Sequence, residues 1–263
     1  MSIELHWSDC FDVFPSIKDQ SIDLVLCDPP YGTTSCKWDS VLPLDLMWKE
    51  LERIVKPKAA ILIFSLQPFT SKLICSNLIL FKYSFVWSKS RALGFQNAKL
   101  RPMTRHEDIS VFSKGNSANR ASNLMQYYPQ GLIQVNKQVK GIKGGKTDQV
   151  GHKMLRPNHK QTYTQQYTNY PDTILNFNNE GKTVHPTQKP VELLEYLIKT
   201  YSLEDQTVLD FTMGSGSTGV ACKNTNRSFI GIEKEKEYFD IAKQRILTEG
   251  IQEPEIDICS MFN

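Results

Sequence analysis

The sequence Leu24-Val25-Leu26-Cys27-Asp28-Pro29-Pro30-Tyr31-Gly32 joins a short apolar run to a rigid polar turn. Residues 23–27 are typical of a buried strand, and the prolines end it because proline donates no ladder hydrogen bond and restricts the residue before it. A carboxylate and an aromatic ring therefore follow the carboxyl end of a strand, which is where ligands bind in open α/β sheets. A plain proline turn fits the same pattern, so the rest of the chain must decide between the two interpretations.

The composition indicates one large folded domain, or one domain with an insertion. The 263 residues are 40% hydrophobic and 22% charged, and the net charge of +3 points to no particular partner. The sequence contains no apolar run long enough to cross a membrane and no signal-peptide pattern, so we expect a cytoplasmic location. We also expect reduced thiols and no metal site, because no C-x-x-C pair occurs among Cys10, Cys27, Cys36, Cys75, Cys222 and Cys259.

Strand-like and helix-like segments alternate along most of the chain. This alternation favours a parallel or mixed sheet with helices on both faces. Strands are expected at residues 3–7, 23–27, 59–64, 84–87, 109–112, 207–210 and 228–233. Helices are expected at residues 10–17, 44–55, 69–80, 191–201 and 235–247, with one more ending near residue 224.

Two segments carry an excess of positive charge. Residues 113–183 show little periodicity and contain ten Lys and Arg against three Asp and Glu, a net charge of +7. Residues 89–105 add five basic residues and no acidic one, in a connection too long for an ordinary hairpin. Either these are solvated segments, or their cations neutralise nucleic-acid phosphates while nearby tyrosines stack. The candidate DNA-binding residues are Lys89, Arg91, Lys99, Arg101, Arg105, Lys137, Lys140, Lys143 and Lys146.

A glycine-rich loop follows the expected strand at residues 207–210. Its sequence, Gly214-Ser215-Gly216-Ser217-Thr218-Gly219, fits the pattern G-x-G-x-x-G. Glycines at these positions let the backbone turn tightly and let a ligand approach the backbone amides. Glu233 ends the next strand, where a carboxylate can accept hydrogen bonds from both ribose hydroxyls. The pattern indicates an adenosine-containing cofactor and leaves a dinucleotide open.

Three motifs and their order resemble the amino-methylating DNA methyltransferases, in particular the β group of that family. The motifs are Asp28-Pro29-Pro30-Tyr31, His185-Pro186-Thr187-Gln188-Lys189-Pro190 and Asp210-x-x-x-Gly214-x-Gly216-Ser217-Thr218, with Glu233 ending the following strand. The resemblance covers about residues 3–112 and 183–247. It implies an α/β fold with a seven-stranded, mostly parallel, Rossmann-like sheet. It divides the chain into a catalytic half at 1–112, a target-recognition insertion at 113–182 and a cofactor-binding half at 183–263.

The resemblance also implies S-adenosylmethionine as cofactor, with no metal. Asp210, Gly214 and Gly216 would line its methionine part, and Glu233 would hold its ribose. Its adenine would contact Asp9 with Cys10 beside it, and its amino-acid end would be approached by His185, Thr187 and Lys189. The family often carries Asp-Pro-Phe before its glycines, whereas this chain has Asp210-Phe211-Thr212, so Phe211 receives no definite contact.

The implied catalytic residues are Asp28, Pro29, Pro30 and Tyr31, acting on a base flipped out of double-stranded DNA. Asp28 and the carbonyl of Pro29 would accept the two amino hydrogens, and the carboxylate would stabilise positive charge developing on the nitrogen. Tyr31 would stack on the base through its ring face, without a need for its hydroxyl.

Several alternatives stay open at this point. Asp28 as the first residue of the tetrapeptide favours adenine N6, while relatives that methylate cytosine N4 more often carry Ser there. Methylation of RNA or a protein amide is typical of relatives with Asn at that position. The glycine loop alone would also suit an NAD-dependent oxidoreductase, and a DNA-binding protein without catalysis is a further possibility. The resemblance suggests a homodimer and says nothing of a partner restriction nuclease.

Overall fold

The fold is taken from a computed structural model that describes residues 1–32, 40–140, 162–179 and 188–248. The chain divides into two compact units. The first contains residues 1–128 and 173–263, and the second contains residues 129–172. All elements that surround the functional site belong to the first unit.

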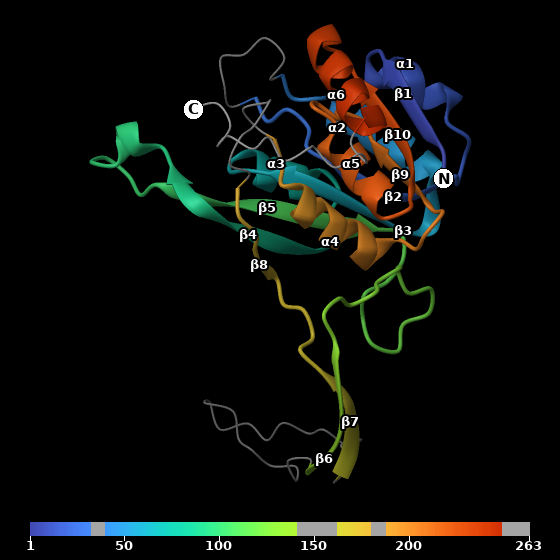
Figure 1. The fold of residues 1–263 in the computed structure, drawn as a ribbon, viewed down its shortest axis with the longest axis vertical. Coiled ribbons are helices and arrows are strands. Elements are labelled where there is room, and N and C mark those ends of the chain that lie inside the picture. The colour runs from blue at the N-terminus through green and yellow to red at the C-terminus, as the bar shows by residue number, and fades with distance from the viewer. Residues whose placement is uncertain (33–39, 141–161, 180–187, 249–263) are drawn as a thin grey trace, which may run out of the picture. The chain divides into compact units, whose positions relative to one another are not determined.

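The first unit is built on an eight-stranded sheet, counted over the described residues, with the order β1-β10-β9-β2-β3-β5-β4-β8 (Figure 1). Its strands are β1 (Ile3–Trp7), β2 (Ile22–Cys27), β3 (Val55–Ser65), β4 (Phe81–Leu93), β5 (Thr104–Ser113), β8 (Ile174–Asn176), β9 (Thr207–Asp210) and β10 (Ser228–Glu233). The first five strands of this order, β1-β10-β9-β2-β3, each pair in parallel with their neighbours. The pairs β3–β5 and β5–β4 are antiparallel, and β8 pairs with β4 in parallel. The sheet is therefore mostly parallel, as predicted.

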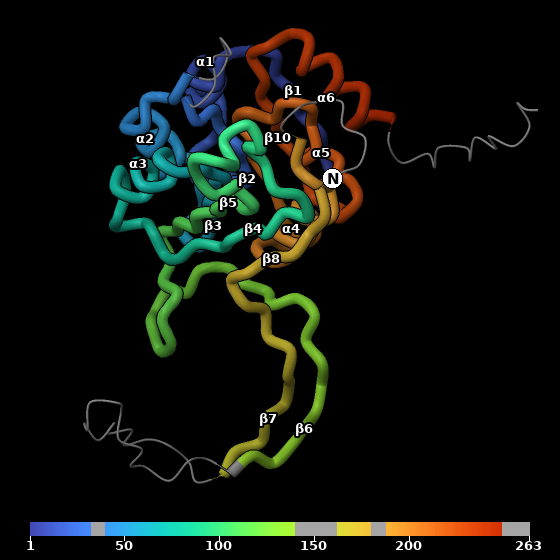
Figure 2. Tube along the Cα trace, turned by 90° about the vertical axis from the view of Figure 1, so that its left-hand side faces the viewer, coloured from blue at the N-terminus to red at the C-terminus, as the bar shows by residue number. Residues whose placement is uncertain are grey.

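Helices cover both faces of this sheet. One core cluster packs the strands against α4 (Val191–Tyr201), α5 (Ser217–Asn224) and α6 (Lys236–Thr248). The other packs them against α1 (Cys10–Val13), the 3-10 turn Phe14–Ser16, α2 (Leu44–Ile54) and α3 (Phe69–Ser76). Figure 2 shows α1, α2 and α3 on one side of the strands and α4, α5 and α6 on the other. None of the helices, within the ranges that the structure describes, is long and apolar enough to cross a membrane.

Strand β2 shows why the sequence predicts a central strand. All six of its residues are buried. Leu24 and Leu26 pack into one core cluster, while Val25 and Cys27 pack into the other. Because successive side chains of a strand point to opposite faces, a strand covered by helices on both sides needs apolar residues at every position.

The seven predicted strands are all present, and the eighth strand, β8, is a correction to the expected count. β8 has three residues, lies at the sheet edge and buries only Leu175. The indole of Trp87 donates to the carbonyl of Phe177 just beyond it, at 3.0 Å. Three residues with one buried side chain are too few to give a recognisable periodicity in the sequence, and tertiary contacts create this strand.

The prediction of a long loop at residues 89–105 is wrong. β4 continues to Leu93 and β5 begins at Thr104, so only Lys99 and Arg101 of the five basic residues lie in the connection. The connection contains the 3-10 turn Phe95–Asn97. Backbone pairing between β4 and β5 extends the strands beyond their apolar parts, which is a long-range effect that periodicity does not register.

The second unit contains a two-stranded antiparallel sheet of β6 (Ile133–Lys140) and β7 (Thr162–Thr168). These strands lie inside the segment for which little periodicity was found. The described side chains of both are mostly exposed, so there is no buried face to impose alternation on the sequence. Residues 113–128, which fall within the predicted insertion, belong to the first unit.

Candidate active site

The candidate site lies where the ends of β2 and β9 meet. These strands are parallel neighbours, and the chain turns outward from them in opposite directions, to β3 on one side and β10 on the other. Such a switch in strand order opens a crevice at the carboxyl ends of the strands. Thr212 links the two ends, because its hydroxyl donates to the carbonyl of Asp28 at 3.2 Å and lies 2.9 Å from Sγ of Cys27.

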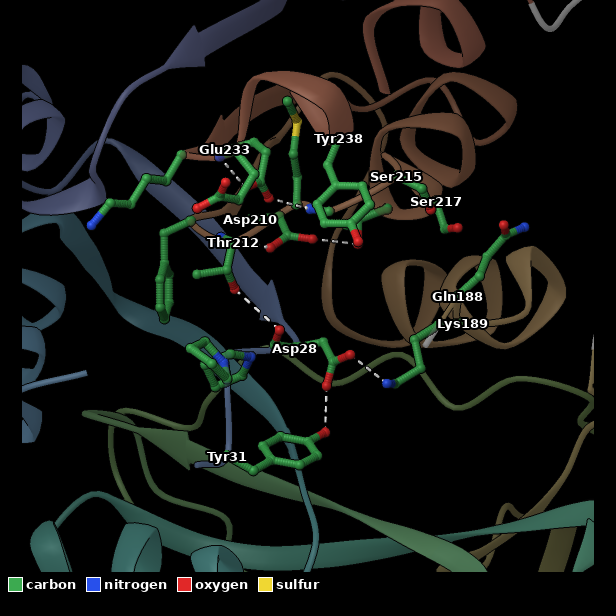
Figure 3. A pocket seen from close by; sticks show the side chains of 18 of the residues that line it. Asp28, Tyr31, Gln188, Lys189, Asp210, Thr212, Ser215, Ser217, Glu233 and Tyr238 are labelled. Carbon is green, nitrogen blue, oxygen red and sulfur yellow. Dashed lines mark hydrogen bonds and ion pairs between the residues drawn. The ribbon is translucent and has the colours of Figure 1, made fainter. Parts of the chain in front are cut away.

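Asp28 is held from two sides (Figure 3). The hydroxyl of Tyr31 donates to Oδ1, and the ammonium group of Lys189 donates to Oδ2. Burial raises the pKa of Asp28, and the nearby carboxylate of Glu107 raises it further, whereas Lys189 and Tyr31 oppose the shift. The side chain keeps 24% of its surface exposed, so the carboxylate remains accessible to a ligand.

Tyr31 stands next to Asp28 with its ring packed on the ring of Phe69. The two rings are stacked, with centroids 5.4 Å apart and an interplanar angle of 24°. Burial and the adjacent carboxylate of Asp28 raise the pKa of Tyr31, so its hydroxyl stays protonated and donates. The sequence had suggested a role for the ring face alone, whereas the structure adds a hydrogen bond from the hydroxyl to Asp28.

A buried charge network extends from Asp28. Lys189 lies 3.3 Å from Oε2 of Glu107, and Lys89 pairs with the other oxygen of Glu107. The two lysines are each 7% exposed and Glu107 is 6% exposed. Burial alone would raise the pKa of Glu107, but the ammonium groups of Lys189 and Lys89 outweigh it and lower the pKa. Lys89 is therefore part of the site and not of an exposed loop.

The glycine loop shapes the other half of the site. Gly214 and Gly216 have φ angles of 53° and 81°, which L side chains rarely adopt. The amide of Gly214 donates to Oε2 of Glu233 at 2.9 Å, and the amide of Glu235 donates to Oε1 at 2.7 Å. A Cβ at Gly216 would approach Ala242 of α6 to 2.9 Å, so this glycine permits the close packing of the loop on α6.

Asp210 anchors the start of the loop. It accepts hydrogen bonds from the hydroxyl of Thr218 at 2.7 Å and the amide of Thr212 at 3.2 Å. Burial raises its pKa from 3.8 to about 7, although both of these hydrogen bonds act in the opposite direction.

Asp9 stands at the end of β1, as predicted, and caps α1. It accepts from the amide of Phe11 at 3.0 Å, and Lys234 donates to it at 3.1 Å. Burial tends to raise its pKa, but these hydrogen bonds prevail and lower it. Burial raises the pKa of the neighbouring Cys10 thiol to about 12, so this group is a neutral lining residue.

These parts enclose one continuous cavity of about 540 Å³, within the usual size range of small-molecule sites. It extends from the glycine loop and Glu233 to Asp28 and Tyr31 (Figure 3). The sequence-predicted residues that line it are Asp9, Cys10, Asp28, Pro29, Pro30, Tyr31, Lys89, Lys189, Asp210, Gly214 and Glu233.

Other predicted residues lie elsewhere. Gly216 shapes the loop without lining the cavity, and Arg91, Lys99, Arg101 and Arg105 are exposed on the β4–β5 hairpin. Lys137 is exposed on β6 of the second unit, whereas the side chain of Lys140 is not described. Four predicted residues fall outside the described residues: the cofactor residues His185 and Thr187 and the DNA-binding residues Lys143 and Lys146.

Sequence reasoning missed several lining residues, including Trp87, Glu107, Gln188, Thr212, Ser215, Ser217 and Tyr238. Ser215 and Ser217 stand inside the glycine loop and Gln188 inside the His-Pro-Thr-Gln-Lys-Pro motif, so motif membership could have identified them. Glu107 carried only a weak signal, which is its place in the acidic pair Glu107-Asp108 before the apolar run of β5. The described residues contain no group of three or more His, Cys, Asp or Glu that could hold a metal ion.

The loop half of the cavity fits an adenosine-containing cofactor. Gly214 lines this half of the cavity. A Cβ atom added at Gly214 would meet no other atom within 4 Å, so the space beside the loop is open at this point. Glu233 accepts two backbone hydrogen bonds, and a carboxylate offers about four acceptor positions, which leaves capacity for ribose hydroxyls.

Comparison with known proteins identifies the class. Residues 22–244 match the family model described as DNA methylase, for N6 and N4 methyltransferases. The chain belongs to this family of amino-methylating DNA methyltransferases, and S-adenosylmethionine is its cofactor. This finding replaces the NAD-dependent alternative that the glycine loop alone had left open.

Particular relatives cover nearly the whole chain. The Type II methyltransferase M1.MboII of Moraxella bovis is 29% identical over 264 residues, which are 91% of this chain and 94% of the relative. M.HpaI of Haemophilus parainfluenzae is 29% identical over 268 residues, 95% of this chain and 76% of the relative. The crystal structure of an M1.HpyAVI–SAM complex aligns with a TM-score of 0.58 and 25% identity, covering 92% of this chain and 99% of that chain. The cytosine-N4-specific PvuII methyltransferase has a TM-score of 0.66 at 16% identity, covering 95% and 88%, and supports the fold alone.

Proposed function

We propose that this DNA methyltransferase transfers a methyl group to the N6 amine of a specific adenine in double-stranded DNA, with Asp28-Pro29-Pro30-Tyr31 as catalytic residues. The observation that carries the proposal is the placement of Asp28. Its carboxylate faces the same cavity as the cofactor loop and stands beside an aromatic ring. One ligand at the loop and a base at Tyr31 would therefore meet at Asp28.

The low reactivity of the adenine amine explains why a carboxylate and a carbonyl are needed at Asp28 and Pro29. The amino nitrogen of adenine is a poor nucleophile because its lone pair is delocalised into the ring. Asp28 and the carbonyl of Pro29 accept the two amino hydrogens, which directs the lone pair away from the ring. The fixed carboxylate stabilises the positive charge that develops on nitrogen. Its raised pKa also makes it a better acceptor for the proton that the nitrogen finally releases.

S-adenosylmethionine supplies a methyl group carried on positively charged sulfur. Asp210 and Gly214 line its methionine part, Glu233 binds the ribose, and Asp9 and Cys10 contact the adenine. For Lys189 we propose a positioning role in addition to its expected place near the amino-acid end of the cofactor. Its ammonium group is bonded to Asp28 and paired with Glu107, so it positions the catalytic carboxylate. His185 and Thr187 keep their assignment near the amino-acid end of the cofactor as a proposal.

The base must leave the duplex to reach Asp28, since its amine is not accessible inside the stack. One face of Tyr31 packs on Phe69, so the flipped base would use the opposite face of the ring. Adenine is favoured over cytosine because the tetrapeptide begins with Asp. Cytosine N4 is the second candidate, since it also offers an exocyclic amine beside a ring acceptor.

Positive charge on the protein surface and similarity to relatives suggest the binding partners. The basic residues of the second unit and of the β4–β5 hairpin would contact DNA phosphates. Several relatives are Type II methyltransferases, so a role in restriction–modification, with a cognate nuclease, is part of the proposal. A homodimer is proposed by resemblance to the β group.

Sequencing with modified-base detection tests the function. DNA from cells that express the wild-type chain is compared with DNA from cells that express Asp28→Ala. We expect N6-methyladenine at one recurring sequence in the first sample alone. If N4-methylcytosine were found at a recurring sequence instead, the target base would be cytosine and not adenine. The absence of any methylated base in either sample, with the protein present and folded, would refute the proposal.

A further inference from the structure

The tip of the β4–β5 hairpin, residues 93–104, presents large apolar side chains to solvent. Phe95 is 79% exposed, Leu100 is 85% exposed, and Leu93 at the end of β4 is 53% exposed. Figure 1 shows the hairpin as a teal and green pair of strands that projects beyond the helices. A group of exposed apolar side chains on one projecting element indicates a contact surface.

This tip is ordered by its own backbone. The amides of Asn97, Ala98 and Leu100 donate to the carbonyls of Gly94, Phe95 and Asn97 at 3.0, 3.0 and 2.8 Å. Leu93 pairs with Thr104 across the hairpin, and Gly94 reverses the chain with a φ of 90°. The apolar side chains are therefore held on a preorganised turn, and a partner that covers them need not first order the backbone.

The surroundings of the tip indicate the charge of its partner. Residues 90–106 contain four basic residues and no acidic one. The four are Arg91, Lys99, Arg101 and Arg105, and all are exposed. A partner that is anionic at its edge and apolar inside fits this arrangement, and duplex DNA has phosphates outside and stacked bases within.

The hairpin also borders the cavity. Trp87, Lys89 and Leu93 of β4, together with Glu107 of β5, line it. Phe95 follows Leu93 by two residues, and two residues of extended chain span at most about 7 Å. A strand of DNA that delivers a base into this cavity must therefore pass close to the tip.

We infer that the hairpin tip is a wedge that inserts Phe95 and Leu100 into the base stack, in the space vacated by the target base. The inference rests on the proposed function, because only a flipped base leaves such a space. Extruding a base costs its stacking and pairing, and apolar side chains inserted between base steps are a recurrent means of offsetting that cost. The flanking arginines and Lys99 hold the adjacent phosphates.

A second copy of this chain fits the tip less well. In a twofold contact the same patch meets itself, so the four cations of one hairpin would face the four of the other. Like charges in contact oppose association, whereas the DNA backbone attracts them.

The test uses the double variant Phe95→Ala/Leu100→Ala and a matched control, Leu78→Ala/Ile79→Ala, whose side chains are 64% and 89% exposed in the turn between α3 and β4. Single-turnover methylation is measured on a duplex that carries the sequence found by modified-base sequencing. It is measured again on the same duplex with the target base opposite an abasic site, where pairing no longer has to be broken. Calorimetry with S-adenosylmethionine verifies that each variant is folded.

We expect the double variant to methylate the intact duplex about ten- to a hundredfold more slowly, the range that corresponds to loss of base stacking. The abasic-site duplex should restore most of the rate, the control should match the wild type, and Phe95→Trp should retain activity. Equal rates for double variant and wild type on the intact duplex would overturn the inference, as would equal losses on both substrates. A change in self-association without a change in rate would instead make the tip a contact between copies and also overturn it. If the wild type itself methylates neither duplex, the proposed function fails, which is a distinct outcome.

Discussion

Lys189 donates a hydrogen bond to the carboxylate of Asp28, although the two residues are 161 positions apart in the sequence. The same ammonium group lies 3.3 Å from Glu107, so one buried cation stands between the buried carboxylate of Glu107 and the partly exposed carboxylate of Asp28. Removing one partner of a buried ion pair leaves an uncompensated charge, which costs more than the pair contributes. The catalytic carboxylate is therefore tied to the His-Pro-Thr-Gln-Lys-Pro motif by electrostatics.

The first prediction concerns this pair. Lys189→Met should lower the free energy of unfolding by about 3–5 kcal/mol, the usual cost of breaking a buried pair. The double variant Lys189→Met/Asp28→Asn should lose less than the sum of the two single variants. Urea unfolding measures the four proteins of the cycle. Lys199→Met is the control, because Lys199 is itself exposed and its pair with Glu195 spans 3.7 Å, and surface pairs of this kind contribute about 0–1 kcal/mol. Additive losses would show that Lys189 does not act through Asp28.

The second prediction concerns Asp28 itself. Asp28→Ala should abolish methyl transfer and leave S-adenosylmethionine binding intact, since the proposed cofactor contacts lie in the loop half of the cavity. Asp28→Asn should retain slight activity, because its amide oxygen still accepts a hydrogen bond but carries no charge. Single-turnover methyl transfer at saturating cofactor separates chemistry from binding. Wild-type rates in Asp28→Ala would assign the carboxylate a purely structural role.

The third prediction distinguishes the ring of Tyr31 from its hydroxyl. Tyr31→Phe keeps the aromatic ring but loses a hydrogen bond to a charged group, typically about 1.5–3 kcal/mol. That hydrogen bond lowers the pKa of Asp28, so its loss should move the acid limb of the rate–pH profile to higher pH. Tyr31→Ala should be slower still, because about 1–3 kcal/mol of base stacking is lost as well. An unchanged profile in Tyr31→Phe would mean that the hydroxyl is dispensable, as the sequence alone had suggested.

The fourth prediction follows from the pKa of Asp210, which burial raises from 3.8 to about 7. Between these values the folded protein binds more protons than the unfolded chain, so this residue makes the free energy of unfolding fall as pH rises. Asp210→Asn removes that titration. The free energy of unfolding of the wild type minus that of the variant should therefore decrease from pH 4 to pH 8. Denaturant unfolding across this range gives the difference, and a constant or rising difference would contradict the raised pKa.

The fifth prediction concerns the basic residues of the predicted insertion. Replacing Lys137, Lys140, Lys143 and Lys146 by Ala should weaken DNA binding and make it less dependent on salt, because each lost phosphate contact reduces the logarithmic slope by about 0.9. Cofactor affinity should not change. Binding is titrated at several salt concentrations. The charge-matched control replaces four exposed lysines of the first unit, Lys18, Lys49, Lys72 and Lys243. An equal reduction of the slope in this control would mean that the insertion acts only through net charge.

Local sequence patterns were sufficient to predict most of the secondary structure and the family of this protein. The apolar run before Asp28, the spacing of apolar residues in the helices and the positive-φ glycines of the loop each constrain their own segment. Seven of the eight strands described in the sheet of the first unit follow from such short-range patterns. The signal is strongest in a central strand such as β2, because a strand buried on both faces must be apolar throughout. Motif order along the chain was also enough to identify the family.

Contacts between residues far apart in the sequence were decided by the tertiary structure alone. Glu107 became a member of the site because β5 pairs with β3 and β4, and Lys89 changed from an expected loop residue to a buried partner of Glu107. The hydroxyl of Tyr31 and the ammonium group of Lys189 meet at Asp28 only after folding. Charge pairing, pKa shifts and edge strands such as β8 depend on what lies nearby in space, and periodicity along the chain carries no record of those neighbours.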